Sequence, residues 1–290
     1  MGGSRGRRTL RPERAHPRRP GRSKDLLALA VCIMQRDIEI IELLYEHRVL
    51  TIHHIRNLHF NSPAVARRRM LRLYRLGVVD RFEPPTAVGS APTHYVLDIL
   101  GARILAAHCG IELRELGWRK ENVEGFPWRQ EFRHLIDINT FFARLAGACR
   151  LDEEHRLIEW LSEARCRRRF GEACQPDGFA LITGPAGSCS LALELDRGTE
   201  SPARLASKLP GYALMGLVDD HPDALLFCVP DSEREISARR RLYSPDGMIL
   251  ATTTLDMHVA DPLGQIWLPS GCERRIPLAS LATHLKEVKQ

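Results

Sequence analysis

The sequence lacks any long hydrophobic run. No apolar stretch approaches the roughly 20 residues that a membrane-spanning helix needs. No apolar segment directly follows the Arg-rich N-terminus to act as a signal peptide. We therefore expect a cytoplasmic protein that has no membrane partner.

Closely spaced cysteines are also absent. The eight cysteines are scattered singly, with no Cys-x-x-Cys pair and no Cys/His spacing that would close a zinc site. Isolated thiols in a cytoplasmic chain are usually buried or incidental. We predict neither a disulfide nor a structural zinc site.

Excess positive charge is confined to one segment of the chain. The net charge is +6, but residues 1–24 hold nine Lys or Arg against one Glu, so the remainder is close to neutral. This segment contains Pro and Gly and almost no apolar residues, which predicts a disordered basic tail. It could bind phosphates without sequence preference, or it could be a solubilising extension only.

At 290 residues the chain is long enough for two domains, and residues 25–108 carry the pattern of the first. Apolar residues at helical spacing predict three short helices, over 37–45, 51–58 and 62–76. Two short apolar segments around a Pro/Gly-rich turn, 78–82 and 93–97, then predict a β-hairpin. This order is typical of a winged helix-turn-helix, which is mainly α.

The third of these helices divides into an apolar and a basic face. One stripe consists of Ala66, Met70, Leu73 and Leu76, and arginines fall on the other. A DNA recognition helix needs this division, because guanidinium groups bind phosphates and base edges. An ordinary helix with a solvated basic face is the alternative. The residues predicted to contact double-stranded DNA are Arg67, Arg68, Arg69, Arg72, Arg75 and Arg81.

The second half of the chain predicts a mixed α/β domain. After a connector at 109–130, residues 131–255 give the order helix, three strands, helix, strand, in which 177–183 and 190–196 form a hairpin. One continuous helix is expected over 203–215, and His134 on the first helix is expected to be structural. Residues 256–290 form a C-terminal extension without an interpretable motif.

Carboxylates interrupt the apolar hairpin strands, and buried charges need a partner. Asp177 and Glu194 are expected to project side by side at the sheet edge, where two carboxylates can hold Mg²⁺ or Mn²⁺ against a phosphodiester. Asp196 could add a third oxygen ligand, and Glu163 a fourth. Lys208 would orient water and stabilise charge on the phosphate. Asp177, Glu194, Asp196 and Lys208 are thus the candidate catalytic residues.

These motifs resemble two known groups of proteins. The element order with Pro176-Asp177, Glu194-x-Asp196 and Lys208 resembles the PD-(D/E)xK, restriction-endonuclease-like superfamily. The stretch from about residue 36 to 255 resembles the replication-relaxation family of plasmid and mobile-element proteins. The residues that carry this second resemblance are Arg67 to Leu73 with Gly77, Tyr95 to Leu97 with Gly101, His134 with Asn139, Trp160-x-x-Glu163, Pro176-Asp177-Gly178, and Glu194-x-Asp196-Arg197-Gly198-Thr199 with Lys208 and Tyr212.

The resemblance implies an α+β chain of two domains, the second restriction-endonuclease-like with a mixed central sheet. It also implies association with plasmid replication or DNA relaxation, and with proteins of replication or mobilisation. Asp196 stands where the superfamily pattern has lysine, so Lys208 would have to supply the amine. The domain could therefore be a metal-dependent endonuclease or nickase, or a degenerate fold in a replication accessory or regulator-like DNA binder. In the second case Asp196 would pair with Arg197 or Lys208.

Two further expectations concern Tyr212 and the oligomeric state. A relaxase would use a tyrosine as nucleophile with a histidine cluster for the metal, and His155, His221 and His258 have no such spacing. Tyr212 is therefore expected to be a packing residue. A homodimer would suit a winged helix that reads two half-sites.

Overall fold

A computed structural model of the chain describes residues 32–84, 86, 89–119, 131–171, 174–216, 221–281 and 283. The predicted basic tail and the second half of the predicted connector, residues 120–130, lie outside these residues. The chain divides into two compact units: unit 1 comprises residues 1–53 and 62–127, and unit 2 comprises residues 54–61 and 128–290. The predicted α+β class with a mixed sheet is confirmed, and that sheet has six strands.

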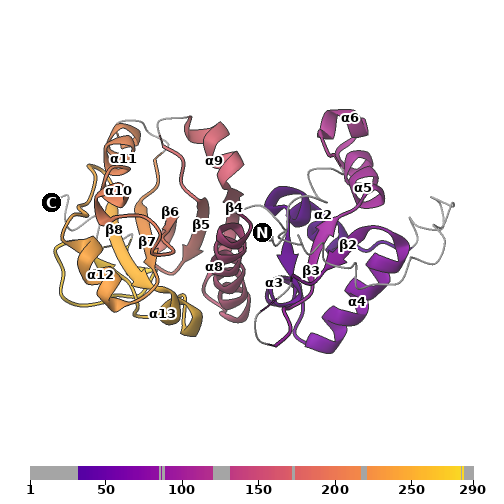
Figure 1. The fold of residues 1–290 in the computed structure, drawn as a ribbon, viewed down its shortest axis with the longest axis horizontal. Coiled ribbons are helices and arrows are strands. Elements are labelled where there is room, and N and C mark those ends of the chain that lie inside the picture. Colours follow the sequence, from indigo (N-terminus) through magenta and orange to yellow (C-terminus); the bar gives the residue numbers. More distant parts are fainter. Residues whose placement is uncertain are drawn as a thin grey trace, which may run out of the picture. The chain divides into compact units, whose positions relative to one another are not determined.

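The N-terminal part of the chain is mainly helical, with a small antiparallel sheet of strand order β1-β3-β2 (Figure 1). The elements are α2 (Gln35–His47), β1 (Leu50–Thr51), α3 (Ile52–His59), α4 (Pro63–Leu76), β2 (Val79–Phe82), β3 (His94–Leu97), α5 (Ile99–Cys109) and α6 (Leu113–Leu116). Most of α3 belongs to unit 2, although its neighbours along the chain belong to unit 1.

Helix α4 begins and ends where its sequence predicts. Pro63 suits the first turn, where a backbone N–H has no helical partner, and Gly77 ends the helix in the left-handed region with φ of 82°. Ala66, Met70 and Leu73 are fully buried on the predicted apolar stripe. Ser62 occupies the cap position but makes no side-chain capping hydrogen bond.

Gly101 lets α5 approach Val78, which directly precedes β2, and Leu97, the last residue of β3. A Cβ at this position would lie 2.3 Å from the backbone oxygen of Val78 and 2.5 Å from a methyl carbon of Leu97. Backbone atoms can shift only at a cost in free energy, so the added methyl group of Gly101→Ala is expected to destabilise the protein. Alanine favours the helix more than glycine does, and with this gain subtracted the net loss is expected to be about 1–2 kcal/mol. Urea unfolding would measure this effect. Arg103→Ala, at an exposed position of the same helix, should change stability little, and equal stability of Gly101→Ala and wild type would contradict the close packing.

Unit 2 is built on a six-stranded mixed sheet of order β4-β5-β6-β7-β8-β9. Strands β4, β5 and β6 are antiparallel neighbours, β6, β7 and β8 are parallel, and β9 is antiparallel to β8. The elements are α8 (Glu131–Leu151), β4 (Arg156–Ser162), α9 (Glu163–Phe170), β5 (Gly178–Gly184), β6 (Gly187–Leu195), α10 (Pro202–Ala206), α11 (Leu209–Met215), β7 (Ala224–Val229), α12 (Ser232–Arg239), β8 (Ile249–Thr254), α13 (Leu255–Ala260) and β9 (Leu268–Pro269).

Helices cover both faces of this sheet. On one face Phe142 of α8 stacks on Trp160 of β4 at 5.4 Å between ring centroids, and Phe141 stacks on His258 of α13 at 3.8 Å. On the other face an apolar cluster joins α10, α11 and α12 to β6, β7 and β8. Strand β7 is buried along its whole length, as its unbroken apolar run predicts for a central strand.

Two expectations about the second half of the chain need correction. The single helix expected over 203–215 is in fact two helices, α10 and α11. The helix is interrupted at Ser207-Lys208, and Pro210 lies in the first turn of the second helix. Residues 256–281 are integral to unit 2, since they supply β9 and the fully buried Trp267. In the described part of the chain, no helix is long and apolar enough to cross a membrane.

Candidate functional site: an acid–lysine cluster at the end of the sheet

Two of the predicted acids lie at the same end of the β5–β6 hairpin. Asp177 directly precedes β5, and Gly178 pairs with Leu193, so Asp177 lies level with Glu194. The backbone N–H of Asp177 donates to Leu193 O at 2.9 Å, and the N–H of Leu195 donates to Asp177 Oδ2 at 2.8 Å. The sheet register therefore fixes Asp177 in both backbone and side chain.

His134 of α8 completes the surroundings of Asp177. Its Nε2 lies 3.0 Å from Asp177 Oδ1, and its side chain is about one-third exposed. Burial by itself would lower the pKa of His134, but the hydrogen bond and the charge of Asp177 outweigh it and raise that pKa above its usual value. His134 was expected to be structural, yet its imidazole faces the candidate site.

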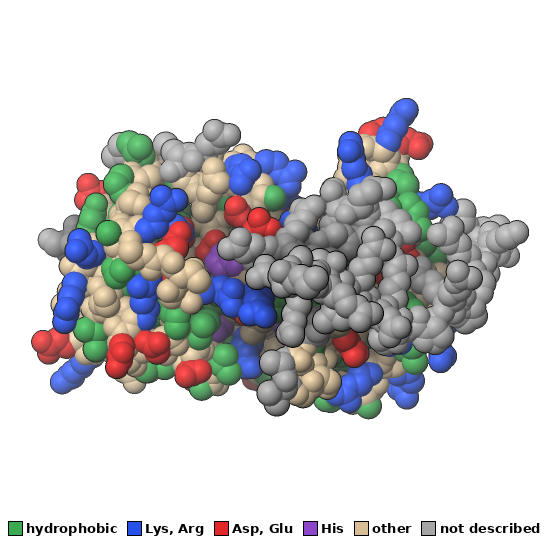
Figure 2. Space-filling view, viewed as in Figure 1, with side chains coloured by type: hydrophobic (Ala, Val, Ile, Leu, Met, Phe, Trp, Pro, Cys, Tyr) green, Lys and Arg blue, Asp and Glu red, His purple; other side chains and the backbone are tan. Residues whose placement is uncertain are grey.

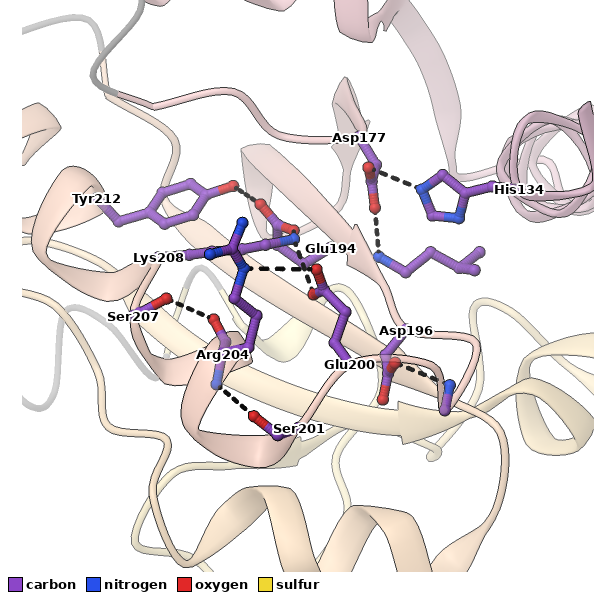
Figure 3. Close-up of polar contacts among 12 residues, drawn as sticks. His134, Asp177, Glu194, Asp196, Glu200, Ser201, Arg204, Ser207, Lys208 and Tyr212 are labelled. Atoms are coloured by element: carbon purple, nitrogen blue, oxygen red, sulfur yellow. Dashed lines mark hydrogen bonds and ion pairs between the residues drawn. The ribbon is translucent and has the colours of Figure 1, made fainter. Parts of the chain in front are cut away.

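Glu194 is almost completely buried and accepts hydrogen bonds from two side chains. The hydroxyl of Tyr212 donates to Oε1 at 2.6 Å, and Lys208 Nζ donates to Oε2 at 2.5 Å. Burial and the nearby charge of Asp177 raise the pKa of Glu194, Lys208 and Tyr212 oppose the shift, and the resulting pKa is about 7. Figure 3 shows Lys208 and Tyr212 meeting at Glu194, while His134 reaches Asp177 from α8.

Lys208 reaches this acid from the break between the two short helices. It occupies the N-cap position of α11, and its Nζ also lies 3.8 Å from Glu200. Burial lowers the pKa of Lys208, but the charge and hydrogen bond of Glu194 overcome this effect and raise it. Lys208 therefore carries a positive charge beside a carboxylate whose own charge is weakened by burial.

The other two predicted acids lie apart from this cluster. Asp196 turns to Arg234 of α12, whose Nε lies 2.5 Å from Oδ2, and it also accepts the N–H of Gly198 at 2.8 Å. Glu163 begins α9 and pairs with Arg167 at 3.4 Å, with both side chains about half exposed. In residues that the structure describes, no group of three or more His, Cys, Asp and Glu side chains is placed to hold a metal ion.

The donor set that remains still fits a magnesium ion. Mg²⁺ keeps several waters and usually takes only one or two protein carboxylates together with substrate phosphate oxygens. Asp177 and Glu194 are two such carboxylates, and each of their oxygens keeps a further lone pair beyond the hydrogen bond that it accepts. These two residues could hold the ion, without Asp196 or Glu163.

Arg197 also has a different partner from the expected one. Its Nε lies 2.9 Å from Asp137 Oδ2 on α8, so it pairs with neither Asp196 nor the acid cluster. Asp137 and His134 are three residues apart and thus share a face of α8. Through His134 this face of α8 contacts Asp177, just before β5, and through Asp137 it contacts Arg197, just after β6.

The predicted DNA-binding arginines of unit 1 divide into two groups. Arg67, Arg68, Arg72 and Arg75 are exposed on α4. Arg69 donates from Nε to Asp37 Oδ1 at 2.8 Å and from Nη2 to Cys32 O at 2.9 Å, so it fixes the start of α2. Arg81 places its guanidinium 4.5 Å from the centre of the Tyr74 ring.

Sequence reasoning missed three contributors to unit 2. Tyr212 was expected only to pack, His134 was expected to be structural, and Arg234 was not considered. A buried tyrosine in an apolar helix needs a hydrogen-bond partner, so a possible signal was the presence of Glu194 as an acid in a buried strand. Nothing in the spacing of Arg234 relates it to Asp196, which is 38 residues away.

Fold and site together define a class: an α+β protein whose second unit carries an acid–lysine cluster at one end of a mixed sheet. The sequence model of the replication-relaxation family matches residues 41–217, which is more than half of the chain. The chain belongs to this family, as its motifs predict. No curated protein and no solved structure gives a significant match.

Proposed function

We propose that this protein binds double-stranded DNA in plasmid or mobile-element replication or relaxation, and that unit 2 hydrolyses a phosphodiester bond with Mg²⁺ or Mn²⁺. The family description, replication-relaxation, supports the biological setting. The observation that carries the chemical part is Lys208 Nζ on Glu194, beside Asp177 at the adjoining strand end. Two acids can hold a metal ion and a lysine can stabilise charge on a phosphate, which suits metal-dependent cleavage of DNA.

For unit 1 we propose a winged helix-turn-helix in which α4 enters the major groove. The chain order α2, β1, α3, α4, β2, β3 and the small sheet of order β1-β3-β2 support this assignment. The exposed arginines of α4 support the DNA contact, because they face away from the buried stripe of the same helix. Arg69 is removed from the proposed contacts, since it is engaged by Asp37.

For unit 2 we propose a restriction-endonuclease-like fold. Its support is the order of α8, the antiparallel strands β4, β5 and β6, the helices α10 and α11, and the parallel strand β7. The order of the acids resembles the PD-(D/E)xK pattern, because Asp177 precedes the second strand and Glu194 lies near the end of the third. The amine comes from Lys208 on the following helical segment in place of the position that Asp196 occupies.

The proposed roles follow from the contacts of each side chain. Asp177 and Glu194 would hold the metal ion, which when bound polarises the phosphate and lowers the pKa of water. Lys208 would stabilise negative charge that develops on the phosphate, because its Nζ is a fixed positive charge in a partly buried place. His134 and Tyr212 hold the two carboxylates in position.

A second candidate function is DNA binding without cleavage. It is favoured by one observation: every oxygen of Asp177 and Glu194 already accepts a hydrogen bond from the protein. A closed network of this kind could have only a structural role. The two functions predict different results in one experiment.

That experiment incubates the protein with supercoiled plasmid carrying its cognate region and Mg²⁺ or Mn²⁺. Metal-dependent nicking or linearisation is expected for the wild type, and Asp177→Asn and Glu194→Gln are expected to lose it while still binding DNA. Because removal of a single catalytic group costs roughly 10²–10³-fold in rate, the loss should be nearly complete in this assay.

The matched control is Glu233→Gln, an exposed acid on α12, which should cleave like the wild type. Glu163→Gln tests the predicted fourth ligand, and full cleavage would remove Glu163 from the site. If the wild-type protein leaves the plasmid intact but binds DNA in a salt-dependent way, the nuclease proposal is wrong and the second candidate function remains.

A further inference from the structure

Helix α9 carries a concentrated positive charge that neither the predicted recognition helix nor the acid cluster accounts for. Its eight residues include four arginines and one glutamate, and the arginines are Arg165, Arg167, Arg168 and Arg169. Arg165, Arg167 and Arg168 are exposed to solvent, and the side chain of Arg169 is about one-third exposed. Figure 2 shows Lys and Arg side chains gathered where Figure 1 draws α9.

Arg169 and Arg167 each contact an acid of unit 2. Arg169 donates to Glu159 at 2.9 Å, and its guanidinium lies 4.8 Å from the centre of the Phe179 ring. Arg167 pairs with Glu163 at 3.4 Å. Arg165 and Arg168 are both exposed and lie three residues apart, so they are neighbours on the helix surface.

The position of α9 places this charge beside the candidate site. The helix begins directly after Ser162, whose partner across the sheet is Gly178, and Gly178 directly follows Asp177. The start of α9 and Asp177 therefore lie at the same end of neighbouring strands.

The helix also lies on the same sheet face as the acids. Cys166 of α9 packs with Leu161 and Phe179. Phe179 pairs in register with Ala192, which belongs to the cluster that contains Tyr212. Glu194 is two residues after Ala192, so its side chain points to this face as well. Phe170, at the end of α9, packs against both clusters.

We propose that α9 is a second DNA-binding surface, on which Arg165 and Arg168 contact backbone phosphates of the strand held at the Asp177–Glu194 site. The acids of this site repel a polyanion, so a cleavage site for DNA needs positive charge close by to hold the backbone. Exposed guanidinium groups suit this task, because they bind phosphate oxygens in a bidentate way. This inference rests on the proposed function for its substrate, but it does not depend on cleavage.

The test measures binding of a fluorescently labelled DNA duplex of mixed sequence to the full chain in EDTA, across a series of NaCl concentrations. Arg165→Ala/Arg168→Ala is expected to lower the affinity roughly tenfold and to reduce the slope of log K against log salt by about 2, one for each lost phosphate contact. Arg165→Lys/Arg168→Lys should keep the wild-type slope, because it keeps both charges, and should lose only part of the affinity, because the bidentate contacts are lost. The matched control, Arg240→Ala/Arg241→Ala, removes two arginines of the same unit that lie outside α9 and should leave both values nearly unchanged.

The outcomes separate this inference from the proposed function. An unchanged affinity and slope in the α9 variant, with a loss in Arg68→Ala/Arg72→Ala, would overturn the role of α9 and leave DNA binding by α4 standing. Equal losses in the α9 variant and the Arg240/Arg241 variant would also overturn it, because the contribution to DNA binding would then not be specific to α9. A loss confined to the α9 variant would support α9 and overturn the recognition helix, and no binding by the wild type would overturn both.

Discussion

Arg69→Ala is expected to lower the free energy of unfolding by roughly 3–5 kcal/mol, the cost of removing one partner from a buried ion pair. Asp37 is only 1% exposed, and both of its oxygens accept hydrogen bonds from Arg69. After the substitution, the carboxylate of Asp37 would remain buried without the two hydrogen bonds from Arg69. It would still accept the hydrogen bond from the backbone N–H of Met34, at 2.7 Å. Urea unfolding followed by circular dichroism would measure the loss.

Two variants show whether the loss comes from the ion pair. Arg68→Ala removes the neighbouring exposed arginine and should change stability by no more than about 0.5 kcal/mol, although it should weaken DNA binding. Arg69→Leu/Asp37→Leu removes both charges and should recover most of the lost stability. An Arg69→Ala protein that unfolds like the wild type but binds DNA poorly would instead return Arg69 to the DNA-binding surface.

The α4 helix shows what the sequence can and cannot predict. Its bounds and its buried stripe follow from Pro63, Gly77 and the apolar period, which are local properties. Arg69 follows the same local pattern as Arg68 and was therefore assigned to DNA. Its actual partner, Asp37, lies 32 residues earlier in the chain, and no spacing rule connects the two residues.

The same limit applies to the candidate site. The strands and the hairpin were predictable because alternation and turn residues specify them, and the hairpin register brings Asp177 level with Glu194. The partners of Asp196 and Arg197 were not predictable. Arg234 and Asp137 reach them from helices on the two faces of the sheet, and only the packing of those helices decides which arginine meets which acid.

Lys208→Met is expected to destabilise the protein in a manner that depends on pH. Lys208 opposes the shift that burial and Asp177 impose on Glu194, so its removal should raise the pKa of Glu194 above the present value of about 7. A folded-state pKa above the ordinary value of 4.5 means that the folded protein binds more protons than the unfolded chain. The loss of stability should therefore be small near pH 5 and should grow as pH rises through the raised pKa of Glu194.

Above that pKa the loss should reach about 2–3 kcal/mol, which is below the full range for a broken buried pair because Lys208 is 35% exposed. Urea unfolding of both proteins at about pH 5 and about pH 9 would measure the difference.

Lys208→Met/Glu194→Gln has no acid to titrate at this position, so the pH dependence caused by Lys208→Met should disappear. Arg204→Ala removes a side chain that is 71% exposed and pairs loosely with Glu200 at 3.8 Å, so it should show almost no effect. A constant loss for Lys208→Met at both pH values would mean that Lys208 contributes packing alone and does not stabilise the charge of Glu194, which would remove the electrostatic coupling on which its proposed role at the phosphate depends.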